Sequence, residues 1–190
     1  MVDQILAEQC PDERIMEAVA LVEADSAAAL STLPRLCSEF PTDPRLRFLL
    51  GSVLAGAGQY AQARSEMREA LRIAPRYAIA RFQLGLLELT SGEPDAAEAT
   101  WRLLEDLSSD DPLRVMAGGL KSLVHDRFAD AISQLERGIT LNTQYPALNG
   151  DMRLLIDGIT AVVAKGGEQQ PETSAAHLLL QQYKTKPTRH

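Results

Sequence analysis

The sequence predicts an all-α protein built as an array of paired helices. Hydrophobic residues make up 45% of the 190 residues and aromatic residues only 5%, and alanine and leucine supply most apolar positions, which favours helices over strands. Apolar residues recur at helical spacing, as at Leu46, Leu50, Val53 and Leu54. A 34-residue internal period completes the evidence, since periods of this length are typical of helical repeats.

The internal period is visible when the sequence is compared with itself at a shift of 34 residues. A glycine inside a helix costs about 1 kcal/mol relative to alanine, so a glycine that recurs there indicates a close approach to another helix. Turn residues, small residues and bulky apolar residues follow the same step. The four series are Gly51, Gly85, Gly119; Gly58, Gly92, Asp126; Ala63, Ala97, Ala131; and Met67, Trp101, Leu135.

These repeats resemble the tetratricopeptide repeat family. The second repeat lacks the terminal proline of the pattern, with Ser109 in its place, and the third has Gly118 where leucine is usual. The resemblance implies a right-handed α-solenoid of helix-turn-helix repeats with flanking capping helices. The first repeat carries the fullest set of family positions, at Leu50, Gly51, Gly58, Tyr60, Ala63, Met67, Ala70 and Pro75.

The helix boundaries follow from capping signals. Asp43-Pro44 and Asp111-Pro112 are each typical of an N-cap followed by proline at the first helical position. We expect the first helix of the three repeats near 44–57, 78–91 and 112–125, and the second near 60–73, 94–107 and 128–141. The repeats then span 44–77, 78–111 and 112–141.

The stretch GAGQYA, from Gly56 to Ala61, has the glycine spacing of a dinucleotide-binding loop. Such a loop requires a strand before the glycines and a helix after them. The preceding residues instead have helical periodicity, so this stretch is predicted to be the turn between two helices.

The flanking segments have different expected roles. Residues 1–43 are predicted to form N-terminal helices or a degenerate repeat, in which Pro34 would kink or interrupt the second helix. Residues 142–165 contain an apolar stripe over 146–164 and are predicted to be a C-terminal capping helix. Residues 166–190 are predicted to be a linker and a leucine-rich tail, whose Leu178, Leu179 and Leu180 dock on the array or elsewhere.

Charge and cysteine content limit the classes of partner. Residues 1–43 contain nine acidic side chains and only Arg14 and Arg35 as basic ones, which accounts for the whole net charge of −7. This balance predicts no binding to nucleic acid and no insertion into a membrane. The lack of a signal peptide predicts a cytoplasmic location. Cys10 and Cys37 are expected to be free thiols.

The family resemblance also implies a binding surface, the concave face lined by the second, fifth, ninth and twelfth residues of each repeat, here called the inner positions. This groove is largely apolar, which suits an amphipathic helix or an extended apolar peptide. Because only Arg45 could bind a carboxylate, a carboxylate clamp is disfavoured. The sequence leaves open whether the groove is open to a partner or covered by the chain's own termini. The inner positions are Arg45, Phe48, Ser52, Ala55, Ile79, Phe82, Leu86, Leu89, Leu113, Met116, Leu120 and Leu123.

The predicted function is a non-catalytic module that binds a protein or peptide in this groove. One alternative is a self-association or autoinhibition module, including a homodimer, whose groove is filled by a terminal segment of the chain. Another is a bacterial secretion or pilus-assembly chaperone, because acidic three-repeat proteins with an apolar groove are similar to the chaperones of type III secretion translocators. The sequence contains no metal-ligand set, nucleophile-base pair or phosphate loop, so no catalytic residue, metal or cofactor is predicted.

Overall fold

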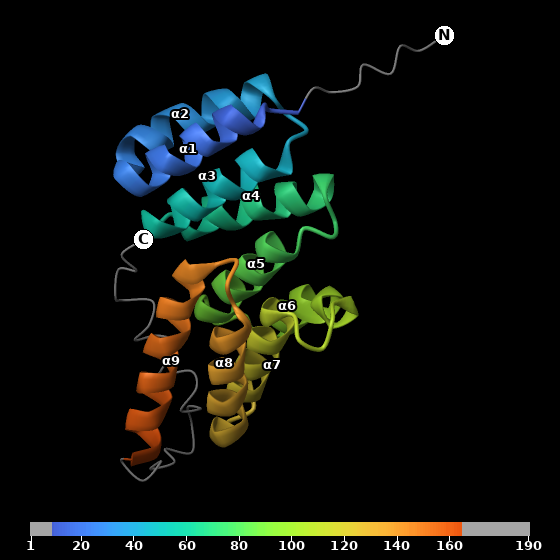
Figure 1. Cartoon of the computed structure of the whole chain (residues 1–190), viewed down its shortest axis with the longest axis vertical. Coiled ribbons are helices and arrows are strands. Elements are labelled where there is room, and N and C mark those ends of the chain that lie inside the picture. The colour runs from blue at the N-terminus through green and yellow to red at the C-terminus, as the bar shows by residue number, and fades with distance from the viewer. Residues whose placement is uncertain (1–8, 165–190) are drawn as a thin grey trace. The chain divides into compact units, whose positions relative to one another are not determined.

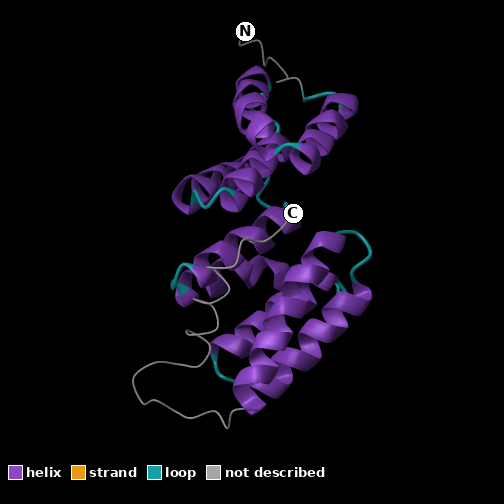
Figure 2. Cartoon of the chain, turned by 90° about the vertical axis from the view of Figure 1, so that its left-hand side faces the viewer, coloured by secondary structure: helices purple, strands orange, loops and turns teal. Residues whose placement is uncertain are grey.

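The computed structural model describes residues 9–164, and within this range the chain consists of helices joined by turns and short loops (Figure 1, Figure 2). Nine α-helices and one 3₁₀ helix are present there, with no strand, so the predicted all-α class is confirmed. The chain divides after Ala80 into two compact units. Each unit is described by itself.

The N-terminal unit contains two helix pairs. The first pair is α1 (Asp12–Ala24) and α2 (Ser26–Glu39), and the second is α3 (Pro44–Gly56) and α4 (Tyr60–Ile73). α1 packs on α2 and α3, and α3 packs on α2 and α4 (Figure 1). The helices α2, α3 and α4 supply the most deeply buried side chains of this unit, among them Ala29, Leu33, Leu46, Ala63 and Met67.

The C-terminal unit begins within α5 (Ala78–Thr90), whose first turn precedes the division. The next repeat positions are occupied by α6 (Pro94–Trp101), the 3₁₀ helix η1 (Arg102–Asp106), α7 (Pro112–Val124), α8 (Phe128–Leu141) and α9 (Pro146–Ala164). α8 packs on α7 and α9, and α6 and η1 both contact α7. The expected first helices are therefore confirmed to within one residue at each end, and the helix expected over 146–164 is present.

The recurring glycines allow the two helices of a repeat to approach closely. A Cβ atom added to Gly51 would lie 2.9 Å from Cγ of Met67 and 3.2 Å from the carbonyl oxygen of Ala63. Carbon atoms without a bond between them need about 3.5 Å or more, so only glycine fits without movement. The same relation recurs in the next two repeats, at Gly85 with Trp101 and at Gly119 with Leu135 and Ala131.

The turns between the two helices of each of the three repeats (α3–α4, α5–α6 and α7–α8) share one hydrogen-bonded form. In GAGQYA, the N–H of Gln59 donates to the carbonyl of Leu54 at 2.8 Å, and the N–H of Gly58 donates to that of Ala55 at 3.0 Å. This is the Schellman ending of a helix, which needs a left-handed residue. The three residues in that conformation are Gly58 (φ 75°), Gly92 (φ 83°) and Asp126 (φ 54°).

The second helix of the second repeat differs from the prediction. It was expected to run to residue 107, but α6 ends at Trp101 and the chain continues as the 3₁₀ helix η1. Leu104 stands 34 residues from Ala70 and Gly138, both buried at the corresponding place. A leucine is too large for that place in an unchanged α-helix, and the tighter 3₁₀ winding carries its side chain into the core, where it is 2% exposed.

Pro34 does not interrupt α2, which runs unbroken from Ser26 to Glu39. Proline lacks an N–H, so one carbonyl a turn earlier loses its helical donor. Pro34 lies on the exposed side of α2, where water can supply the missing bond. The expected interruption is therefore wrong, and the exposed position of Pro34 leaves the freed carbonyl a route to solvent that a buried proline would not have.

Candidate functional site

The predicted binding surface consists of the inner positions, and the structure buries most of them. The inner residues of α3 are half-buried, whereas those of α5 and α7 are buried. The buried inner residues of α5 and α7 belong to the hydrophobic core. That they contact a binding partner stays a prediction. Exposed fractions are 6% or less at Ile79, Phe82, Leu86, Leu89, Leu113, Met116, Leu120 and Leu123.

The fifth residue of a repeat shows why an inner position becomes buried. Phe82 stacks on Trp101 of α6 with ring centroids 6.3 Å apart, and its carbonyl accepts a hydrogen bond from Nε1 of Trp101 at 3.1 Å. Cγ of Met116 lies 2.5 Å from the place where a Cβ atom on Gly138 of α8 would stand. Each side chain therefore packs against the second helix of its own repeat.

Phe48 of α3 occupies the same place in the first repeat and remains half-buried. Its ring meets that of Tyr77 edge-on, with centroids 5.5 Å apart and an interplanar angle of 67°. Ser52 and Ala55 continue this face along α3 and are also half-buried, and Oγ of Ser52 donates to the carbonyl of Phe48 at 3.0 Å. We call the surface formed by Phe48, Ser52 and Ala55 of α3 together with Tyr77 the α3 inner face. It is partly aromatic, and all four residues are partly accessible.

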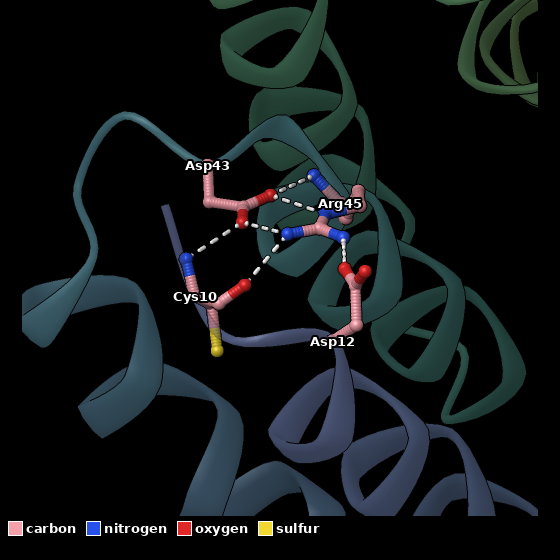
Figure 3. A network of polar contacts seen from close by, with 4 residues as sticks. All are labelled: Cys10, Asp12, Asp43 and Arg45. Atoms are coloured by element: carbon pink, nitrogen blue, oxygen red, sulfur yellow. Dashed lines mark hydrogen bonds and ion pairs between the residues drawn. The ribbon is translucent and has the colours of Figure 1, made fainter. Parts of the chain in front are cut away.

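Arg45, the inner residue expected as the candidate for binding a carboxylate, is held by groups of its own chain (Figure 3). Its Nε donates to Oδ1 of Asp43 at 3.0 Å, and its Nη2 donates to Oδ2 of Asp43 at 2.7 Å and to the carbonyl of Cys10 at 2.8 Å. Its Nη1 pairs with Oδ1 of Asp12 at 2.5 Å. A carboxylate ligand would have to displace these partners.

Asp43 is the centre of this network. Its side chain is fully buried, whereas that of Arg45 is 32% exposed. It caps α3 by accepting from the backbone N–H of Arg45 at 2.9 Å, and it accepts from the backbone N–H of Cys10 at 3.0 Å. Burial alone would raise the pKa of the Asp43 carboxyl, but the hydrogen bonds from Arg45 and Cys10 hold that pKa below its ordinary value. The network therefore fixes the segment before α1 to the start of α3.

Sequence reasoning missed Cys10 and Asp12 as partners of Arg45. Asp43 and Arg45 are two residues apart at a helix N-terminus, which is a usable signal, since an N-cap carboxylate lies close to the side chains of the first turn. Cys10 and Asp12 lie 35 and 33 residues earlier than Arg45. No motif connects them to Arg45, and only the tertiary fold brings them there.

The repeat geometry agrees with comparison to known proteins. The sequence profile of the tetratricopeptide repeat family matches residues 17–78 and residues 48–112, which together cover about half of the chain. The chain belongs to the tetratricopeptide repeat family. The first match begins inside α1, so the likeness to the tetratricopeptide repeat extends to the N-terminal helix pair.

Two tetratricopeptide repeat proteins are similar to this chain. It is 33% identical over 94 residues to tetratricopeptide repeat protein 34 of Mus musculus, covering 50% of this chain and 16% of that protein. It is 28% identical over 171 residues to the TPR repeat-containing thioredoxin TTL4 of Arabidopsis thaliana, covering 89% of this chain and 23% of that protein. The chain thus spans less than a quarter of the length of either relative.

Membership of the tetratricopeptide repeat family has general consequences for function. Such repeats generally mediate protein–protein interaction, and proteins built from them are generally non-catalytic scaffolds. Within residues 9–164, no group of three His, Cys, Asp or Glu side chains could hold a metal ion. No helix in the described part of the chain is long and apolar enough to cross a membrane.

The two cysteines of this tetratricopeptide repeat protein are free, as predicted, and both are buried. Burial raises the pKa of both thiols, to about 11 for Cys37. Both thiols are therefore protonated at neutral pH, and a protonated thiol is a poor nucleophile and a poor metal ligand. Leu178, Leu179 and Leu180, predicted to dock, lie outside the described residues.

Proposed function

We propose that the chain is a non-catalytic interaction module that binds an apolar or amphipathic peptide at the α3 inner face. The observation that carries this proposal is the half-exposed aromatic pair of Phe48 and Tyr77. Aromatic anchors at the centre of an apolar surface contribute a large share of binding free energy.

The self-association alternative stays a prediction, because the inner leucines of α7 are buried as part of the hydrophobic core and their burial does not require a terminal segment in the groove. The secretion-chaperone role stays a prediction, because no described contact distinguishes it from other peptide-binding roles.

The proposal is tested by selecting a displayed peptide library against the full chain and measuring the affinity of the selected peptides. Phe48→Glu replaces the anchor by a charge, and Ser65→Glu places the same charge at an exposed site on α4. We expect Phe48→Glu to weaken binding at least about tenfold, which corresponds to about 1.4 kcal/mol, and Ser65→Glu to change it less than twofold. Circular dichroism checks that both variants remain helical. If the selected peptides bind Phe48→Glu as well as they bind the wild type, the α3 inner face is not the binding surface.

A further inference from the structure

The face of α1 that points away from α2 and α3 leaves apolar side chains in solvent. α1 packs on α2 and α3, and Ala18 is its only buried residue. Met16 and Ala20 each stand two positions from Ala18, which places them about 160° around the helix from it. Met16 is 71% exposed, Val19 is 38% exposed, and Ala20 is also exposed. Within residues 9–164, these apolar side chains therefore remain open to solvent.

Three carboxylates border these apolar side chains. Glu13 and Glu17 lie along one edge and Glu23 along the other, and all three are exposed. None of the three forms an ion pair with another residue of the range 9–164, whereas the other two charged side chains of α1 each form one inside the N-terminal unit. Apolar side chains rimmed by polar ones mark interaction sites. We define the α1 patch as Glu13, Met16, Glu17, Val19, Ala20 and Glu23.

The charge and form of the α1 patch select the class of its partner. Its carboxylates repel nucleic acid, anionic lipid headgroups and the same patch on a second copy of the chain. A complementary partner must present apolar side chains flanked by basic ones. Because the backbone groups of a helix are bonded within it, α1 offers a strand no edge to pair with. Another helix can interdigitate its side chains with those of α1.

We propose that the α1 patch binds a basic amphipathic helix of another protein. The apolar side of that helix covers Met16, Val19 and Ala20, and its lysines or arginines lie beside the three glutamates. α1 has only 13 residues, so a single partner helix buries less than the roughly 1,200 Å² of a stable interface. The contact is therefore transient, with apolar burial supplying affinity and the charges supplying specificity. It shares no residue with the α3 inner face and is separate from the peptide binding proposed there.

The test measures the binding of a labelled helical peptide to the full chain by fluorescence anisotropy at low ionic strength. The peptide carries leucines at i, i+3, i+4 and i+7 spacing with lysines on both sides of them, and its control carries a glutamate in place of each lysine. We expect the lysine peptide to bind at least about tenfold more tightly than the glutamate peptide. High salt should remove most of this difference, because it screens exposed charges.

Removing charge at two places shows whether the glutamates of the α1 patch are the ones that bind. Glu13→Gln with Glu17→Gln should weaken binding of the lysine peptide at least about fivefold, since two ion pairs are lost. Asp106→Asn with Glu136→Gln removes the same amount of charge at exposed sites on η1 and α8 and should change binding less than about twofold.

The apolar contact is tested at Met16. Met16→Gln should weaken binding of the lysine peptide at least about threefold, because a buried thioether chain is replaced by an amide. Leu154→Gln is the matched control at a residue that is 46% exposed on α9, and it should leave binding unchanged. Phe48→Glu should also leave it unchanged, so the α1 patch and the α3 inner face are tested separately.

Several results would each overturn the proposal: equal binding of the two peptides, equal loss in the two charge-removing variants, normal binding by Met16→Gln, or loss of binding in Phe48→Glu, which would place the peptide on the α3 inner face. Sedimentation velocity of the chain without peptide tests a second copy as the occupant. A dimer that Met16→Gln dissociates would assign the α1 patch to self-association instead. Circular dichroism checks that every variant remains helical.

Discussion

The network around Asp43 predicts that Arg45→Met will destabilise the N-terminal unit. The substitution keeps an apolar stem and removes the guanidinium, which donates two hydrogen bonds to a fully buried carboxylate. Removing one partner of a buried ion pair costs about 3–5 kcal/mol. Here Arg45 is one third exposed and Asp43 keeps two backbone donors, so we expect a smaller loss of about 2–3 kcal/mol.

Hydrogen exchange measures this loss within one unit, because peptides from α1 to α4 report on the N-terminal unit and peptides from α7 to α9 serve as an internal reference. A loss of about 2–3 kcal/mol corresponds to roughly 30-fold to 150-fold faster exchange. Arg72→Met is the matched control, since Arg72 pairs with Glu69 at the surface, with side chains 69% and 35% exposed. Such pairs contribute little. If Arg45→Met speeds exchange no more than Arg72→Met does, the assigned role of the network is wrong.

The same variant should change how stability depends on pH. The pKa of Asp43 in the folded protein lies below its ordinary value of 3.8, so this carboxylate adds stability above a pH of about 4. That contribution is lost as the pH falls through the folded-state pKa. Without the guanidinium the effect of burial on the pKa is less opposed and the pKa rises. We therefore expect the acid unfolding midpoint of Arg45→Met, followed by circular dichroism, to move to higher pH.

Two further predictions concern glycine and cysteine. Gly85→Ala would place a Cβ atom 2.2 Å from Nε1 of the fully buried Trp101 and should cost roughly 1–3 kcal/mol, whereas Gly150→Ala meets no atom within 4 Å and should gain up to about 1 kcal/mol. Urea unfolding followed by Trp101 fluorescence compares the two, and equal stabilities would show that the close approach is unnecessary. Because Cys37 is 2% exposed and its pKa is raised to about 11, iodoacetamide at pH 8 should alkylate it at least about a hundredfold more slowly in the folded protein than in urea; equal rates would contradict its burial.

Features set by neighbouring residues were predictable from the sequence. The helix starts at Pro44 and Pro112 follow from the capping aspartates before them. The turn at Gly58 follows from the glycine, which readily adopts the left-handed conformation found there. These signals act over a few residues, so a sequence pattern contains them in full.

Features set by packing were not predictable in the same way. The repeat pattern identifies which side of α7 bears Leu120 and Leu123, but it does not tell whether another part of the chain covers that side. The change of winding after Trp101 depends on the size of Leu104 relative to residues in other repeats. The partners of Arg45 are brought together only by the fold, because they come from distant parts of the sequence.

The hydrogen bonds of the recurring turn have a consequence for how such a chain can arise. In each repeat the two closing bonds run back to the first helix, as from Gln59 to Leu54 and from Arg127 to Ser122. None of these bonds involves a neighbouring repeat. A copied 34-residue segment therefore brings a complete joint with it, and tandem duplication of a gene segment can lengthen the array without inventing a new turn. Asp126 shows that the joint does not depend on glycine, because the turn keeps both bonds with an aspartate in the left-handed conformation.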